Sequence, residues 1–423
     1  MNILIFPSGS MVAKEIYDAL IYEKNIEIYG TDYDTNNLSS FLFKNYIPGC
    51  PFIKDKNETI EFLNNIVTLH NIKYIFPAFD NIMLFLKENE TEINAKIIGS
   101  DIEVINICNS KLLTYKLLEN SILTPKIYNN NITDINSIKY PLYSKPIIGY
   151  GSRNHKIINN ITDLLSVDTD NNLILEYLPG KEYTVDCISS NGKVLYCNAR
   201  ERIKTLNGMS IQSKTVKLDN IDLIAVKIQE KVNFKGAWFF QVKYDDNNNL
   251  KLLEIACRIP GAMCVNRVKG VNFPLLSMLV HENKDIEPIL FNNNIDVECY
   301  KIYSNYYKTN IVFDAVYCDL DDTLIINNKV NLLLIQFLYK CINSNIKLYL
   351  ITRNPEPNII LEKYKINLFD EIIKLPKNHL ILKSTYISGI NSIFIDDSYT
   401  ERLDVKLHKN ILCFSPSEIE LLL

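Results

Sequence analysis

Three short apolar runs in the last third of the chain each end in acidic or hydroxyl residues, and this recurrence limits the possible folds more than any other feature. The runs are "AVYC", "KLYLIT" and "SIFI", rich in β-branched and aromatic residues and separated by helical patterns. Such runs are typical of parallel strands buried on both faces. Ligands bind beyond the carboxyl ends of parallel strands. The side chains expected at that edge are Asp319, Asp321, Thr352, Asp396 and Asp397.

Carboxylates gathered in this way stay ionised together only beside a cation, and hard oxygen ligands favour Mg²⁺. Asp319 and Asp321 are two residues apart, so we expect both to project to the same side of a strand end. One carboxylate is then able to attack a phosphorus atom and form an aspartyl phosphate. A hydroxyl such as that of Thr352, together with a lysine, would hold the phosphoryl oxygens. The pattern therefore predicts Mg²⁺-dependent phosphoryl transfer.

These motifs, in this order, resemble those of the haloacid dehalogenase (HAD) superfamily of phosphotransferases. The resemblance implies that Asp319 is the nucleophile and Asp321 the general acid/base. Lys383 is the preferred lysine of the third motif, with Lys374 and Lys377 as rivals. The 28 residues between Thr323 and Thr352, and the 30 between Thr352 and Lys383, are too few for a cap domain, which implies a capless HAD-like Rossmannoid domain. The implied metal ligands are Asp319, Asp321, Asp396 and Asp397.

The first 100 residues alternate strand and helix patterns, as in "NILIF", "MVAKEIYDALIYE" and "IKYIFPAFD". This alternation favours a parallel, doubly wound sheet. The turn "PSGS" lies where a nucleotide-binding turn would lie, but it lacks G-x-G-x-x-G. An ordinary strand-to-helix turn is the preferred interpretation.

The middle of the chain begins with a helical segment and then becomes rich in strands. The N-G of "EYTVDCISSNGKVLYCNA" and the "DDNNN" of "VKYDDNNNLKLLEI" predict hairpin turns in an antiparallel sheet. In "YPLYSKPIIGYGSRNH", Lys145 ends a strand and Gly149, Gly151 and Ser152 follow. A glycine-rich turn bares N–H groups for phosphate oxygens, and a nearby lysine adds a positive charge. The only tryptophan, in "GAWFFQV", is expected in the core.

Together with "LILEYLPGKEYTVD" and "LEIACRIPG", these segments resemble the ATP-grasp superfamily, in the branch of carbamoyl-phosphate synthetase and biotin carboxylase. The resemblance implies a Rossmann-like pre-ATP-grasp domain (1–100), an ATP-grasp domain (101–305) and the HAD-like hydrolase domain (306–423), a multidomain α/β and α+β protein. The implied ATP-binding residues are Lys111, Lys145, Gly149, Gly151, Ser152, Glu176, Tyr177, Leu178 (176–178 as the adenine hinge) and Glu182. Gln241 and Glu254 are the implied Mg²⁺ ligands, and Arg202 and Arg258 would steady an acyl phosphate.

One position departs from the ATP-grasp pattern. The usual E-I-N-x-R reads here as Glu254-Ile255-Ala256-Cys257-Arg258, so an alanine replaces the asparagine that completes the metal shell. Two alternatives follow. Either ATP and water alone hold a second Mg²⁺, or the ligase is slow or degenerate.

Composition limits the partners. The chain has 423 residues, 47% of them apolar, and a net charge of −4, so it carries no basic excess that would indicate nucleic-acid binding. It has neither a signal-peptide pattern nor a run long enough to span a membrane, and its ten cysteines are scattered, as in a cytoplasmic protein with reduced thiols.

The leading interpretation is a bifunctional cytoplasmic enzyme. An ATP-dependent carboxylate–amine ligase would be fused to a phosphatase, with ATP and Mg²⁺ (or Mn²⁺) as cofactors. The expected partners are a small carboxylate, an amine, a phosphorylated small molecule or sugar, and a second copy in a homodimer. In the alternative, the phosphatase is active and the ATP-grasp half is a non-catalytic lid that binds nucleotide or substrate.

Overall fold

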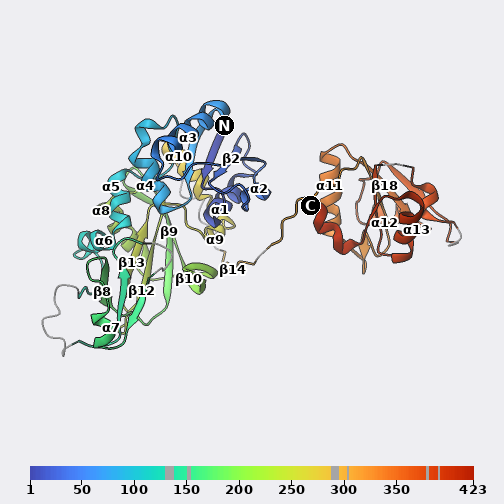
Figure 1. Cartoon of the computed structure of the whole chain (residues 1–423). Coiled ribbons are helices and arrows are strands. Elements are labelled where there is room, and N and C mark those ends of the chain that lie inside the picture. The colour runs from blue at the N-terminus through green and yellow to red at the C-terminus, as the bar shows by residue number, and fades with distance from the viewer. Residues whose placement is uncertain (129–137, 150–153, 287–294, 303, 378–380, 389–390) are drawn as a thin grey trace. The chain divides into compact units, whose positions relative to one another are not determined.

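The structure is a computed structural model that divides into two compact units, Met1–Tyr303 (unit 1) and Ser304–Leu423 (unit 2) (Figure 1). Unit 1 takes in both domains expected before residue 305, and the boundary expected at residue 100 stays a prediction. The described residues are 1–423 except 129–137, 150–153, 287–294, 303, 378–380 and 389–390.

The N-terminal part of unit 1 has a parallel sheet with strand order β3-β2-β1-β4-β5. Its apolar runs are buried because helices cover the sheet, and Ile3, Leu4 and Ile5 have no exposed surface. The strands are β1 (Asn2–Phe6), β2 (Glu27–Asp32), β3 (Asn45–Pro48), β4 (Ile72–Pro77) and β5 (Lys96–Ile97). The helices are α1 (Met11–Leu20), α2 (Ser39–Leu42), α3 (Lys56–His70), α4 (Asp80–Glu88) and the 3₁₀ turn η1 (Glu90–Glu92).

The rest of unit 1 has a small antiparallel sheet, β7-β6-β8, and a large one with order β13-β12-β9-β10-β11-β14. The elements of the first half are α5 (Ile102–Asn109), α6 (Lys111–Leu118), β6 (Leu142–Pro146), β7 (Lys156–Ile158), α7 (Ile161–Leu165) and β8 (Asn172–Glu176). Those of the second half are β9 (Glu182–Ser190), β10 (Lys193–Leu206), β11 (Met209–Val216), α8 (Ile221–Val232), β12 (Gly236–Tyr244), β13 (Leu250–Ala256), α9 (Cys264–Arg267), α10 (Phe273–His281) and β14 (Glu298–Tyr300).

Both predicted hairpins of the large sheet are confirmed. The β9–β10 turn is Asn191-Gly192, with φ of +51° and +75°, the left-handed pair that a two-residue hairpin turn requires. The β12–β13 turn is closed by Asp245, whose Oδ1 accepts hydrogen bonds from the N–H groups of Asn247 (2.9 Å) and Asn249 (2.8 Å).

The large sheet has one apolar and one polar face, because successive side chains of a strand alternate. On the apolar face, Val185, Trp238 and Phe240 pack against α8. Trp238 is fully buried and stacks on Phe234 with the ring centroids 4.2 Å apart, so its expected place in the core is confirmed. The opposite face carries Thr184 and the other polar residues considered below.

Unit 2 has a parallel sheet with order β19-β18-β15-β20-β21. Its central strands are buried, with Val316 and Leu348 at 0% exposure. Every residue between Cys318 and Lys347 is described, and the secondary structure there is the β16–β17 hairpin and α11. The elements are β15 (Ala315–Cys318), β16 (Ile325–Ile326), β17 (Lys329–Val330), α11 (Leu332–Asn343), β18 (Lys347–Thr352), α12 (Pro357–Lys363), β19 (Glu371–Lys374), η4 (Lys383–Tyr386), β20 (Ser392–Ile395), α13 (Tyr399–Lys409), β21 (Leu412–Phe414) and η5 (Pro416–Leu422).

All ten cysteines are free, as expected. Within the residues that the structure describes, no helix combines the length and the apolarity needed to cross a membrane.

Candidate functional site

The acidic residues of unit 2 meet at the carboxyl edge of its sheet. β15 and β20 are parallel neighbours, and the N–H of Asp319 donates to the carbonyl of Ile395 at 2.9 Å. This pairing places Asp319 beside Asp396 and Asp397. One carboxylate oxygen from each of these three lies within 4.8 Å of the others, which is close enough for a shared cation. We call these three residues the acidic cluster.

Lys383 lies inside the acidic cluster. Its Nζ donates to Asp319 Oδ1 and Asp396 Oδ2, both at 2.6 Å, and its side chain is 4% exposed. Burial raises the pKa of Asp319 to about 7, although the Lys383 charge acts to lower it, and burial also raises the pKa of Asp396. The two rival lysines, Lys374 and Lys377, are exposed. A single ammonium group leaves the acidic cluster with excess negative charge, which fits a divalent cation.

Asp321 and Thr352 lie near this edge but make different contacts. β15 ends at Cys318, so Asp319 and Asp321 both lie beyond the strand and the expected strand alternation does not apply to them. Asp321 is exposed and lies outside the acidic cluster in the described residues. Its carboxylate accepts from Asn354 Nδ2 at 2.9 and 3.0 Å. Thr352 ends β18, is fully buried, and accepts from the Asn354 N–H at 3.1 Å.

Asn354 and Thr323 are further polar contacts of this edge. Sequence reasoning missed Asn354, although it directly follows the Thr352 motif. Thr323 Oγ1 accepts from the N–H of Asp397 at 2.8 Å and donates to its carboxylate at 3.2 Å. Asn354 and Thr323 thus hold the exposed carboxylates of Asp321 and Asp397 in place.

In unit 1 a row of side chains crosses the polar face of the large sheet. The strand registers pair Glu254 with Gln241, Gln241 with Thr184, and Thr184 with Arg200. Paired residues project from the same face. The predicted ligand positions Glu254 and Gln241 are therefore adjacent, and arginines approach them from β10.

Two buried lysines lie near Glu254. Lys145 Nζ donates to Tyr115 Oη at 2.6 Å and to the carbonyl of Leu253 at 2.7 Å, and Lys111 Nζ donates to the carbonyl of Gly149 at 2.7 Å. Burial lowers the pKa of Lys145 to about 7, and it lowers that of Lys111, while the Glu254 charge acts to raise both. When both lysines are protonated, their two positive charges face one carboxylate that has no ion pair among the described residues, which leaves the site with a deficit of negative charge. Gly151 and Ser152 lie outside the described residues.

The expected adenine hinge and ribose residues lie at the ends of β8 and β9. Glu176 binds Lys251, whose Nζ is 2.6 Å from both carboxylate oxygens. Tyr177 follows Glu176, and Leu178 is buried. Glu182 begins β9 and forms an ion pair with Arg202, with Oε1 2.7 Å from Nε.

The two arginines expected to steady an acyl phosphate differ. Arg202 is buried on β10, and its Nη2 donates to the carbonyl of Gly208 at 2.7 Å. Arg258 follows β13 and holds Asp80 with two hydrogen bonds, at 2.8 and 3.0 Å, while its Nη1 donates to the carbonyl of Ile259. Arg258 therefore joins β13 to α4, and among the described residues it makes no hydrogen bond or ion pair with Arg202.

Tyr115, Tyr143 and His155 belong to the same site and were missed. Tyr143 Oη lies 2.9 Å from His155 Nδ1. Burial, together with the charges of Lys145 and Lys111, lowers the pKa of His155 to about 4, so its imidazole is neutral at pH 7. Tyr143 could have been found, because it lies two residues before Lys145 on β6 and so shares its face. Nothing in the local pattern indicates His155.

The "PSGS" turn is occupied by side chains of the chain itself. The N–H of Gly9 donates to Asp32 Oδ2 at 2.7 Å, and Ser8 Oγ donates to Ser39 Oγ at 2.7 Å. A Cβ at Gly9 would lie 2.9 Å from both Asn37 Nδ2 and Asp32 Oδ2. The geometry is that of the strand-to-helix turn preferred from the sequence.

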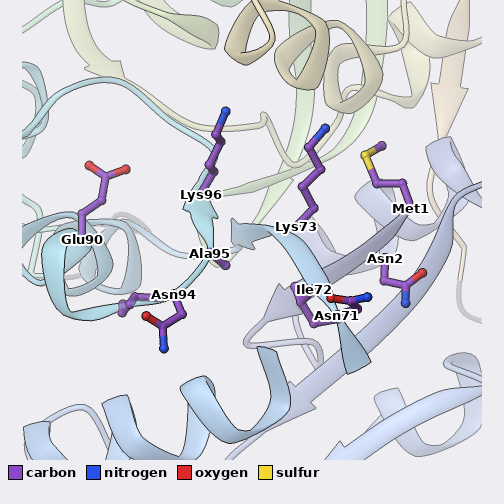
Figure 2. A pocket seen from close by; sticks show the side chains of 10 residues that line it. Met1, Asn2, Asn71, Ile72, Lys73, Glu90, Asn94, Ala95 and Lys96 are labelled. Carbon is purple, nitrogen blue, oxygen red and sulfur yellow. The ribbon is translucent and has the colours of Figure 1, made fainter. Parts of the chain in front are cut away.

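An open pocket lies at the amino ends of β1, β4 and β5, opposite the edge where ligands of a parallel sheet bind. Lys73 and Lys96 both line this pocket, and Figure 2 shows their side chains extending from the ribbon in the same general direction. None of the predicted site residues lines it.

Comparisons with known proteins agree with the ATP-grasp interpretation. Residues 168–301 match the model of a family described as ATP-grasp in the biosynthetic pathway with Ter operon. A biotin carboxylase from Campylobacter jejuni, solved with a β,γ-ATP complex, superposes with a TM-score of 0.56 at 16% identity, over 68% of this chain and 72% of that one. An L-amino acid ligase from Bacillus licheniformis superposes with a TM-score of 0.55 at 16% sequence identity, over 74% of this chain and 82% of that one.

A third solved structure, N5-carboxyaminoimidazole synthetase from Staphylococcus aureus complexed with ADP, gives a TM-score of 0.54 at 17% identity, over 68% of this chain and 78% of that one. Unit 1 thus has an ATP-grasp fold. The HAD-like interpretation of residues 306–423 gains no support from these comparisons and stays a prediction.

Proposed function

We propose that unit 1 is an ATP-dependent carboxylate–amine ligase. The observation that carries the proposal is the pair of buried lysines, Lys111 and Lys145, beside Glu254 on an ATP-grasp fold, where the other nearby carboxylates, Asp80 and Glu182, are already paired with arginines. Polyphosphate oxygens would supply the negative charge that this arrangement lacks. Solved structures of similar fold hold ADP or a β,γ-ATP complex, and one is an amino acid ligase.

The proposed reaction has two steps. A substrate carboxylate attacks the γ-phosphorus of ATP, and ADP leaves with an acyl phosphate formed. An amine then attacks the acyl carbon, phosphate leaves, and the amine gives up a proton, so the products are an amide, ADP and phosphate. Lys111 and Lys145 would hold phosphoryl oxygens, and Arg202 would hold the acyl phosphate, because phosphoryl transfer depends mainly on positioning and charge neutralisation. Mg²⁺, when bound at Glu254, would screen the phosphate charge.

ADP release tests this proposal. The Asp319→Asn chain, in which the other proposed activity is silenced, is incubated with Mg-ATP and pools of carboxylic acids and amines. We expect ADP release that depends on the pool and is lost in Asp319→Asn/Lys145→Ala. The matched control Asp319→Asn/Lys227→Ala, changed at an exposed lysine of α8, should keep it. Nucleotide binding without ADP release from any pool would instead support a non-catalytic nucleotide-binding role, which Ala256 favours.

We also propose that unit 2 is a Mg²⁺-dependent phosphatase of the HAD type. The carrying observation is Lys383 bound at 2.6 Å to both Asp319 and Asp396 at the carboxyl edge of a parallel sheet. The carboxylate of Asp319 would attack the phosphorus, and the alcohol would leave with a proton from Asp321. Water would then hydrolyse the aspartyl phosphate and return a proton to Asp321. Mg²⁺ at the acidic cluster would neutralise charge on the phosphoryl oxygens.

A further inference from the structure

We infer that the nucleotide site of unit 1 is built for one divalent cation, with the guanidinium of Arg202 where ligands of a second cation would lie. The inference rests on the proposed nucleotide-binding function of the same site. The residues of this site differ from the ATP-grasp pattern, which implies more metal ligands than this chain provides.

A second cation would need further carboxylates as ligands. Three of those around the site are already neutralised by ion pairs, Glu176 with Lys251 at 2.6 Å, Glu182 with Arg202 at 2.7 Å and Asp186 with Arg200 at 2.8 Å. Breaking an ion pair leaves both charges uncompensated, most severely in the fully buried Asp186–Arg200 pair, so these carboxylates are poor ligands for an added cation. Glu254, by contrast, is in no ion pair with any of the described residues. One carboxylate together with substrate phosphates is a normal ligand set for one Mg²⁺.

The positions next to Glu254 offer few ligating atoms. Ala256 lies two residues further along β13 on the same face, opposite Phe239 of β12. Neither side chain has a ligating atom. Gln241, opposite Glu254, offers a neutral amide in place of a charged ligand. The side chains beside Glu254 are therefore unable to supply the ligands of a second cation.

The guanidinium of Arg202 lies beside the amide of Gln241. With its amide oriented to satisfy both neighbours, Gln241 donates to Glu254 Oε1 at 3.2 Å and accepts from Arg202 Nη1 at 3.1 Å. The Gln241 oxygen is then occupied by a donor rather than free for a metal. Although burial lowers the pKa of Arg202, an arginine stays charged at physiological pH. Arg202 thus places a fixed positive charge one amide away from Glu254, which repels a second cation and attracts phosphate.

The test counts metal ions per bound nucleotide in the full chain. Asp319→Asn/Asp396→Asn serves as the background, because it removes two ligands of the acidic cluster. Mn²⁺ and a non-hydrolysable ATP analogue are measured together by equilibrium dialysis, and the Mn²⁺ bound without analogue is subtracted. We expect about one Mn²⁺ per bound analogue. A ratio near two with the analogue bound overturns this inference and leaves the nucleotide site intact. Absence of bound analogue overturns the proposed function itself.

A gain-of-site variant gives the complementary measurement. Gln241→Glu/Ala256→Asn/Arg202→Gln restores two ligating side chains and removes the guanidinium, so the ratio should rise by about one Mn²⁺ per analogue. A folded triple variant that binds the analogue at an unchanged ratio contradicts the assignment of these positions. Should its thermal unfolding show that it does not fold, Ala256→Asn/Arg202→Gln provides the same comparison with less disturbance of β12.

Discussion

The candidate sites of the two units have opposite charge imbalances. In unit 2, Asp319, Asp396 and Asp397 share one ammonium group, so the site lacks positive charge. In unit 1, Lys111 and Lys145 face one unpaired carboxylate, so the site lacks negative charge. Burial removes the screening of water, and it also disfavours the charged forms, so it raises the pKa of Asp319 to about 7 and lowers that of Lys145 to about 7 until a ligand of opposite charge binds. The comparison indicates what each site should bind, a cation in unit 2 and a polyphosphate in unit 1.

The largest expected effect is that of Asp319→Asn on unit 2. An amide is no nucleophile, so hydrolysis of a model phosphate ester should fall by on the order of 10⁴-fold or more. The matched control is Asp322→Asn, at an exposed aspartate with a φ of +56° that asparagine also adopts, and it should keep most activity. Hydrolysis that persists in Asp319→Asn would remove the assigned nucleophile.

The next effect is on stability. Lys383→Met leaves the buried carboxylates of Asp319 and Asp396 without their cation, which should destabilise unit 2 by about 3–5 kcal/mol near pH 8. Hydrogen exchange of peptides from unit 2, measured in the full chain, should report the loss, and peptides from unit 1 should be unchanged. Lys374→Met, at the exposed rival lysine, should have little effect. Equal losses of unit 2 stability in the two variants would contradict the role of Lys383 as the counter-charge of Asp319 and Asp396.

In unit 1 the corresponding change is Lys145→Met. Losing a charged hydrogen-bond donor to phosphate should weaken ATP binding by about 10- to 100-fold. Calorimetric titration with a non-hydrolysable analogue measures this loss, and Lys227→Met is the control. An unchanged affinity would mean that Lys145 does not contact the nucleotide and that unit 1 lacks its proposed counter-charge.

The site of unit 2 could be predicted largely from its local sequence. Asp319 and Asp396 directly follow apolar strands and Thr352 ends one, so the sheet alone brings them to one edge. Lys383 was already preferred over Lys374 and Lys377 from the sequence, but its hydrogen bonds to Asp319 and Asp396 were seen only in the structure, because it lies in η4 and not at a strand end. Asp321 was assigned to a strand end, but β15 stops at Cys318.

The site of unit 1 depends on contacts between distant segments, which a local pattern does not record. The Arg258–Asp80 pair joins residues 178 positions apart, and Lys145 reaches the carbonyl of Leu253 across 108 positions. The resemblance supplied the residue types at Lys111, Lys145 and Glu254. It gave no indication that Arg258 is held by α4.

The smallest expected effect is on proton binding, because burial shifts the pKa values of Asp319 and Lys145 in opposite directions. The folded pKa of Asp319, raised to about 7, lies above the unfolded value of about 4, so its contribution to stability is present below pH 4 and is lost as the pH rises through 7. The folded pKa of Lys145, lowered to about 7, lies below the unfolded value of about 10.4, so its contribution is present above pH 10 and is lost as the pH falls through 7.

Ligands should therefore move protons in opposite directions. Mg²⁺ binding to the acidic cluster at pH 6 requires ionised Asp319 and should release up to about one proton, whereas nucleotide binding at pH 8 favours charged Lys145 and should take up to about one. Titration calorimetry in buffers of different ionisation enthalpy measures both quantities. Lys145→Met should abolish only the uptake and Asp319→Asn only the release. Proton release in both titrations would contradict a neutral Lys145 at pH 8. Of Asp319 and Lys145, only Asp319, in the acidic cluster of unit 2, would then have a pKa shifted by burial.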